Sequence, residues 1–98
     1  DGNLHPNIPF DRRDAEQVER VELASAEIMR ACVDAGGTIT GEHGVGVDKQ
    51  KYMGLVFDEA MLEAMAAVRD VFDPKGLLNP GKVLPILRDG DGRPEVVE

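Results

Sequence analysis

The chain lacks the features that would place it in several broad classes of protein. It has one cysteine, Cys32, in 98 residues, so neither an internal disulfide nor a cysteine pair for a redox or zinc site can form. Its apolar runs are far shorter than the roughly 18 to 20 residues of a transmembrane helix, and no basic-then-apolar leader opens the chain. The 11 basic residues are outnumbered by 19 acidic ones, which argues against a nucleic-acid partner, because such a partner demands a basic patch.

Length and charge set further bounds on the function. The formal charge of −8 mostly reports solubility, and we expect a cytoplasmic location. A chain of this size buries only about 60 to 65% of its unfolded surface, so a deep, self-contained active-site cavity is not expected. The sequence opens without Met, directly in the turn-type residues Asp1, Gly2 and Asn3. We therefore expect it to be the C-terminal piece of a longer protein.

Two amphipathic helices are predicted from the spacing of apolar residues. The first follows a cap at Asp11, runs for about twenty residues with apolar positions three and four apart, and ends at Gly36-Gly37. The second begins after an N-cap at Asp58 and ends before Asp73-Pro74. A short helical turn is expected near residues 48–53.

Two short segments are expected to be extended strands. Residues 4–8 alternate in character, with a proline that confines them to a sheet edge, and residues 38–40 are β-branched. The predicted class is α+β, with two long helices packed on a small, partly incomplete antiparallel sheet that needs further strands from elsewhere. We expect residues 1–87 to form this domain portion and residues 88–98 to be a polar, flexible tail.

The segment from Gly41 to Gly46 is the most informative part of the sequence. Its three glycines permit positive φ and close approach of the backbone, so it is suited to present the acid Glu42 and the base His43. With His5, these residues supply two imidazoles and a carboxylate, the ligand types of a catalytic divalent metal site. Because neighbouring side chains on a strand diverge, we assign His5 and Glu42 to the metal. His43 is then free to act as a base, since an imidazole can take up a proton near neutrality.

Other interpretations stay open on the residues alone. His5 can equally be a hydrogen-bonded surface histidine and Glu42 a loop carboxylate. The glycine-rich segment could instead cradle a phosphate, although it has neither the dinucleotide fingerprint nor a Gly-Lys-Ser/Thr sequence. Residues 79–82 are typical of an ordinary turn, and Cys32 of inert packing on a helix face.

Three motifs follow one another along the chain. They are Asp1-Gly2-Asn3-Leu4-His5-Pro6-Asn7, Gly37-Thr38-Ile39-Thr40-Gly41-Glu42-His43-Gly44-Val45-Gly46 and Phe72-Asp73-Pro74-Lys75-Gly76-Leu77-Leu78-Asn79-Pro80-Gly81-Lys82. In this order they resemble the C-terminal region of FAD-linked oxidases of the vanillyl-alcohol oxidase type, which include the glycolate oxidase FAD-linked subunit and the D-lactate and D-2-hydroxyglutarate dehydrogenases. The resemblance covers nearly all of the chain before Arg88. It implies a fragment of a ferredoxin-like C-terminal domain.

The resemblance also implies roles for individual residues. His5 and Glu42 match metal ligands, and His43 matches the base that takes the 2-hydroxyl proton. Asn7 matches a residue near the substrate, and Asn79 one that lies against the flavin. The implied cofactors are FAD, bound mainly through a missing N-terminal domain, and a divalent metal such as zinc. A further metal-binding histidine is expected a few residues before the first residue given.

The function implied is that of a flavin-dependent 2-hydroxy acid dehydrogenase, which oxidises a substrate of the glycolate or D-lactate type to the 2-oxo acid. Without the flavin-binding part, we expect this fragment to be inactive. The implied partners are the 2-hydroxy acid, the rest of the flavoenzyme chain and other oxidase subunits, which would hold it at the periphery of the inner membrane; the fragment could also form a homo-oligomer. The alternative is a free-standing, non-catalytic α+β binding or assembly module, which a start codon just before Asp1 would favour.

Overall fold

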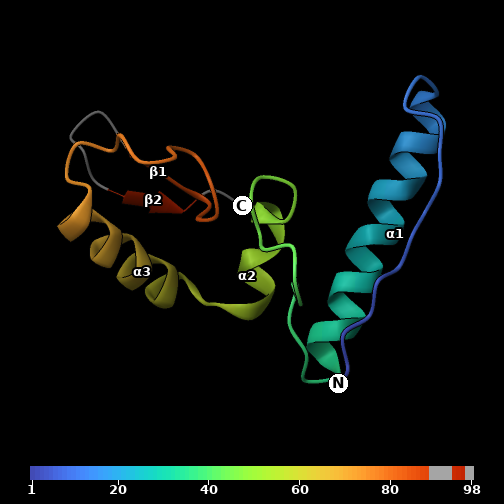
Figure 1. The fold of residues 1–98 in the computed structure, drawn as a ribbon, viewed down its shortest axis with the longest axis horizontal. Coiled ribbons are helices and arrows are strands. Elements are labelled where there is room, and N and C mark those ends of the chain that lie inside the picture. The colour runs from blue at the N-terminus through green and yellow to red at the C-terminus, as the bar shows by residue number, and fades with distance from the viewer. Residues whose placement is uncertain (89–93, 97–98) are drawn as a thin grey trace. The chain divides into compact units, whose positions relative to one another are not determined.

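A computed structural model describes residues 1–88 and 94–96 of the chain. The elements, labelled in Figure 1, are α1 (Ala15–Asp34), η1 (Gln50–Tyr52), α2 (Met53–Val56), α3 (Glu59–Phe72), β1 (Ile86–Arg88) and β2 (Pro94–Val96). The chain divides into two compact units, Asp1–Gly44 and Val45–Glu98. None of the helices in the described ranges has both the length and the apolar composition of a membrane span.

The long helix α1 confirms the first helix prediction but begins at a different cap. Asp14 is the N-cap, and its carboxylate accepts the backbone N–H groups of Glu16 and Gln17 at 3.0 and 3.3 Å. The predicted cap, Asp11, instead pairs with Arg13 at 3.0 Å. The side-chain hydrogen bond from Arg13 lowers the pKa of Asp11. Two aspartates compete at this helix start, and the one nearer the first turn takes the free N–H groups.

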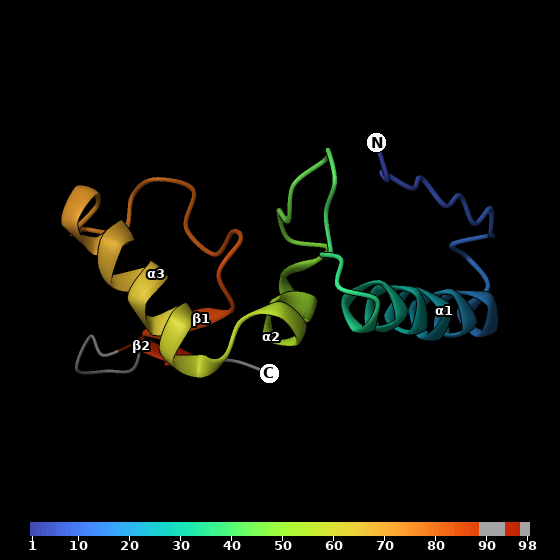
Figure 2. The same cartoon turned by 90° about the horizontal axis from the view of Figure 1, so that it is seen from below.

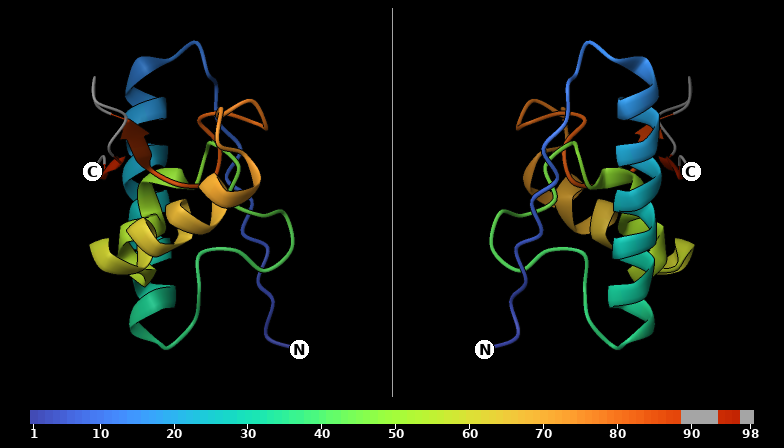
Figure 3. Two further views of the ribbon diagram at one scale, coloured as in Figure 1. Left: turned by 90° about the vertical axis from the view of Figure 1, so that its left-hand side faces the viewer. Right: turned by 90° about the vertical axis from the view of Figure 1, so that its right-hand side faces the viewer.

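The N-terminal segment runs alongside α1 in the first unit, as Figures 1 and 3 show. Pro6 and Ile8 line an apolar hollow with residues of the helix, namely Val21, Ser25, Ile28 and Met29. Neither residues 4–8 nor residues 38–40 form a strand in the structure. The sheet expected from those two segments is therefore not present among the described residues, because an extended segment becomes a strand only when another lies beside it to share hydrogen bonds.

The second unit is built around α3. Asp58 caps it as predicted, accepting the N–H of Met61 at 2.9 Å, and the helix ends at Phe72, just before the predicted stop. Its buried side chains are Leu62 and Ala66. The short helical turns η1 and α2 add the buried side chains of Tyr52 and Met53 to this unit. A helical turn was predicted close to these residues.

A small antiparallel hairpin contacts α3, as seen in Figure 2. Its strands β1 and β2 pair in the register Ile86↔Val96, Leu87↔Glu95 and Arg88↔Pro94. β1 begins in the predicted domain portion, residues 1–87, and only Arg88 and β2 fall in the predicted tail, residues 88–98. Of that tail, residues 89–93 and 97–98 lie outside the described residues, whereas Arg88 and residues 94–96 belong to the strands.

Truncation of Leu62 should destabilise the second unit. The side chain is only 1% exposed, so Leu62→Ala is expected to lower the free energy of opening by about 2–5 kcal/mol through lost burial and the cavity left behind. Hydrogen exchange of the α3 amides in the full-length protein measures this quantity. The matched control is Met61→Ala on the same helix, where the side chain is 51% exposed and the change should stay within about 0.5 kcal/mol. Equal effects of the two substitutions would contradict this assignment of the core.

Candidate functional site

A tight bend presents Glu42 and His43 at the end of the first unit. The hydroxyl of Thr40 accepts a hydrogen bond from the N–H of Gly44 at 2.9 Å and closes the bend. Gly44 has a φ of 78°, in the left-handed region that glycine enters at little steric cost. The prediction that glycines here serve to present their neighbours is consistent with this geometry.

Gly41 meets a different requirement, close approach of the N-terminal segment. A Cβ atom at this position would lie 2.1 Å from Oδ1 of Asn3, so a side chain there would force Asn3 to move. The Nδ2 group of Asn3 in turn donates a hydrogen bond to Oε1 of Glu42 at 3.3 Å. Sequence reasoning missed this partner, although Asn3 stands two residues before His5 in the first motif. Asn3 holds the Glu42 carboxylate in place.

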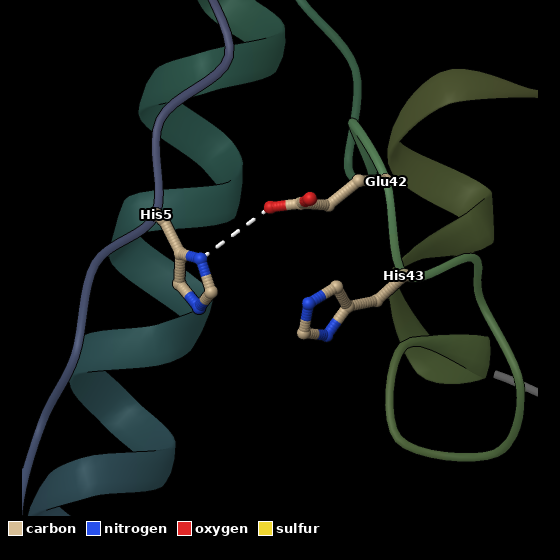
Figure 4. A group of neighbouring side chains, drawn as sticks. All are labelled: His5, Glu42 and His43. Atoms are coloured by element: carbon tan, nitrogen blue, oxygen red, sulfur yellow. Dashed lines mark ion pairs between the residues drawn. The ribbon is translucent and has the colours of Figure 1, made fainter.

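His5, Glu42 and His43 converge in the first unit, as Figure 4 shows. Nδ1 of His5 lies 3.4 Å from Oε1 of Glu42. The rings of His5 and His43 meet edge to face, with centroids 5.2 Å apart and an interplanar angle of 87°. One potential ligand atom from each residue lies within 4.8 Å of the other two. The structure thus brings together three residues that the sequence places in two separate motifs.

The geometry removes the reason for separating Glu42 from His43. That separation assumed a strand, on which adjacent side chains point to opposite faces. The segment is a bend instead, and both side chains extend toward His5 (Figure 4). The arrangement therefore allows all three residues to bind one ion, as well as the predicted division in which His43 acts as a base.

The cluster suits a divalent metal in donor type and nearly in spacing. Ligand atoms about 2.1 Å from a tetrahedral ion lie about 3.4 Å apart, and the pair formed by His5 and Glu42 already has this separation. A pair of ligand atoms at the outer limit of 4.8 Å would have to approach by about 1.4 Å for all three residues to bind one ion. The side chains of His5 and Glu42 are 57% and 54% exposed, so packing within this chain leaves them room for small rotations.

Asn7 lies on the same N-terminal segment as His5 and is exposed. Pro6 and Ile8 line the hollow beside α1. Asn7 follows His5 by two residues and is not among the residues that line that hollow. The placement is compatible with a contact between Asn7 and a ligand held at His5.

Asn79 belongs to the second unit, in the loop between α3 and β1. It has a φ of 45°, and Val83 in the same loop has a φ of 67°. Asparagine tolerates the left-handed region, but this conformation costs a β-branched residue such as Val83 about 1–2 kcal/mol, so other contacts must hold the loop there. Asn79 faces a hollow of about 500 Å³, whose other lining residues are Gly46, Arg69, Phe72, Asp73, Leu78, Lys82 and Val83.

Two charged residues at the end of α3 hold the Asn79 loop. The guanidinium of Arg69 donates to the carbonyl oxygens of Leu78, of Asn79 at 2.8 Å and of Lys82 at 3.3 Å. The Asp73 carboxylate, 7% exposed, accepts the N–H groups of Leu77 and Leu78, both at 2.9 Å. Together the two side chains bond to both donors and acceptors of the loop backbone.

The same contacts keep Asp73 ionised. Hydrogen bonds from the backbone N–H groups of Leu78 and Leu77 lower the pKa of Asp73 below its ordinary value of 3.8, and the charge of Arg69 acts in the same direction. A carboxyl group whose pKa is lower in the folded state stabilises that state fully above its unfolded pKa. This contribution is therefore present above pH 3.8 and is lost as the pH falls through the lower folded value.

Sequence reasoning did not find the residues that hold this loop. Arg69 lies in the last turn of the second predicted helix and Asp73 in the third motif just after it, and this proximity of opposite charges to the Asn79 loop could have revealed them. Gln50 gave no such signal, yet its Nε2 donates to the carbonyls of Leu84 at 2.7 Å and Gly81 at 3.3 Å. These partners are distant in sequence, so only the fold shows them.

Residues 1–83 match the family described as FAD linked oxidases, C-terminal domain. The match covers most of the chain, and the chain belongs to this family. It confirms the resemblance drawn from the three motifs.

Individual relatives carry related names. The chain is 48% identical over 83 residues to glycolate oxidase subunit GlcD of Bacillus subtilis, covering 85% of this chain and 18% of that protein. It is 36% identical over 85 residues to the mitochondrial D-lactate dehydrogenase [cytochrome] of Arabidopsis thaliana, covering 87% and 15%. It is 38% identical over 85 residues to D-2-hydroxyglutarate dehydrogenase of Stutzerimonas stutzeri, covering 85% and 18%. The chain therefore spans less than a fifth of the length of each of these relatives.

Proposed function

We propose that this chain is the C-terminal part of a flavin-dependent dehydrogenase that oxidises a 2-hydroxy acid of the glycolate or D-lactate type to the 2-oxo acid. The observation that carries the proposal is the convergence of His5, Glu42 and His43 in a member of the FAD-linked oxidase family. The relatives named for glycolate, D-lactate and D-2-hydroxyglutarate support the substrate class. All three compounds carry a hydroxyl group on the carbon next to a carboxylate.

His5 and Glu42 would hold a divalent metal ion in this proposal. An imidazole and a carboxylate suit zinc, manganese or iron. When bound, such an ion polarises the oxygens of the substrate and favours loss of the hydroxyl proton. Asn3, which donates to Glu42 at 3.3 Å, orients the carboxylate in the way that outer partners of metal ligands do.

His43 would take the proton of the 2-hydroxyl group. Its ring stands edge to face with that of His5 at 5.2 Å, so a hydroxyl held at His5 and Glu42 comes within reach of its free nitrogen. FAD supplies the acceptor for the hydride that leaves C2 as the carbonyl forms.

The two asparagines would contact the two reactants. Asn7, two residues after His5, would bind a polar group of the substrate. Asn79 would lie against the flavin, and its position on the wall of the 500 Å³ hollow supports this role.

The remaining part of the enzyme would complete the fold. Buried residues are absent from α1, and several large apolar side chains at and after α3 are exposed, namely Val68, Val71, Phe72, Leu77 and Leu78. Amphipathic helices normally bury such faces, so we expect the rest of the chain to cover them, to add strands to an antiparallel sheet and to bind most of the FAD. The fragment would then be inactive alone, whether monomeric or self-associated.

The name of the relative GlcD as a subunit supports an assembly with further oxidase subunits. In that assembly the enzyme would be cytoplasmic and would lie at the inner membrane through its partners.

Anaerobic mixing of the purified full-length protein with 2-hydroxy acids tests the proposal. We expect glycolate, D-lactate or D-2-hydroxyglutarate to bleach the absorbance of the bound oxidised flavin, and L-lactate serves as the stereochemical control. The isolated 98-residue chain should retain no flavin. A full-length protein that holds FAD yet is reduced by none of these acids would overturn the proposed activity. A flavin spectrum from the isolated chain would overturn its proposed dependence on the rest of the enzyme.

A further inference from the structure

The loop that carries Asn79 is held by more backbone contacts than an exposed turn requires. Arg69 donates to three of its carbonyl oxygens, those of Leu78, Asn79 and Lys82. The segment loops back beside α3 on its way to β1, as Figures 1 and 2 show. Arg69 is half-buried, and its planar guanidinium directs donors to several separate acceptors in a fixed fork, a geometry that the compact ammonium group of a lysine does not reproduce.

These contacts act on the backbone of Asn79 and leave its side chain unused. The carbonyl of Asn79 is bonded to Arg69 at 2.8 Å, and its φ of 45° is in the left-handed region. The carboxamide has no hydrogen bond among residues 1–88 and 94–96, and Asn79 is one of the residues that line the hollow. A carboxamide both donates and accepts hydrogen bonds. It can therefore donate to a ring nitrogen or a carbonyl oxygen on the edge of a heteroaromatic ring and accept from an adjacent N–H group.

We propose that Arg69 is a positioning residue for the cofactor, acting through Asn79: by fixing the carbonyls on either side of the bend, it aims the Asn79 carboxamide at the polar edge of a flavin ring. The inference rests on the proposed function, in which Asn79 meets the flavin. Arg69 itself donates its hydrogen bonds to the loop backbone and need not touch the cofactor. Asp73 supports the arrangement by holding the N–H groups of Leu77 and Leu78.

Arg69→Lys in the full-length protein tests this role, because it keeps the charge and removes the planar fork. We expect FAD to bind about 10-fold more weakly in reconstitution of the apoprotein followed by flavin fluorescence, and amides of residues 77–83 to exchange faster. Asn79→Gly removes the carboxamide and tolerates the positive φ, so it should weaken FAD binding similarly with a smaller rise in exchange. The double variant should bind FAD no more weakly than Asn79→Gly alone, since coupled residues are not additive.

Three results would overturn the inference. They are an unchanged FAD affinity in Arg69→Lys, unchanged exchange of the loop, or additive losses in the double variant. If Arg69→Lys does not yield folded protein, Asp73→Asn should show the same pattern to a smaller degree, and unchanged FAD affinity and exchange there would also count against it. Absence of FAD from the wild-type protein would overturn the proposed function itself, which is distinct from a failure confined to the Arg69 variants.

Discussion

Replacement of His43 by alanine is expected to slow reduction of the bound flavin by the 2-hydroxy acid by about 10²–10⁴-fold, the usual contribution of a positioned general base. FAD content should not change, because the proposed flavin contact lies at Asn79. Stopped-flow measurement of flavin reduction under anaerobic conditions gives the rate directly. Added imidazole should restore part of it, since a free base can enter the space that the exposed side chain leaves.

The same variant distinguishes the two arrangements that the geometry allows. If His43 is a base, metal content stays at the wild-type level while the rate falls. If all three residues of the cluster bind the ion, rate and metal content fall together, and His43 is a ligand. A wild-type rate of reduction with FAD bound would exclude both roles for His43.

Glu42→Gln should remove the proposed metal from the site. The amide keeps the size of the side chain and an oxygen that can accept from Asn3, but it lacks the charge that a divalent ion needs. Loss of a residue that hydrogen-bonds to a metal ligand lowers metal affinity by about 10–100-fold. Loss of the charge of the ligand itself should therefore lower metal affinity by at least about 100-fold. Elemental analysis after dialysis against a chelator measures the metal, and flavin reduction should fall in parallel.

Two further variants serve as comparisons for Glu42→Gln, one with a smaller expected effect and one with none. Asn3→Ala should lower metal affinity by about 10-fold, since Asn3 only orients the carboxylate. Glu27→Gln removes an exposed acid of α1 in the same unit and should change neither metal content nor rate. Metal content equal to wild type in Glu42→Gln would remove Glu42 from the proposed site.

Local features of the sequence predicted the helices because helix signals act over a few residues. The spacing of apolar residues in α1 and α3, together with the cap at Asp58, was enough to predict that both helices exist and approximately where they end. The cap of α1 was misplaced by three residues because Asp11 and Asp14 are both suitable side chains. Arg13 decides between them by binding Asp11.

Strands were harder to predict because they depend on partners remote in the chain. Residues 4–8 and 38–40 have strand-like composition but no hydrogen-bonded neighbour within the described residues, and neither is a strand. β1 and β2 pair with each other and contact α3, and neither strand was predicted. Such pairing depends on context more than on the composition of a short segment.

By itself, the sequence determined the family, the two long helices and the identity of the chemical groups in the cluster, because motif order, apolar periodicity and residue type are properties of the chain alone. Only the tertiary structure decided that Glu42 and His43 point the same way, since a bend rather than a strand carries them. Only the tertiary structure showed Asn3 on Glu42 and Arg69 on the Asn79 loop. Such contacts join atoms that only folding brings together, so residue types alone do not reveal them.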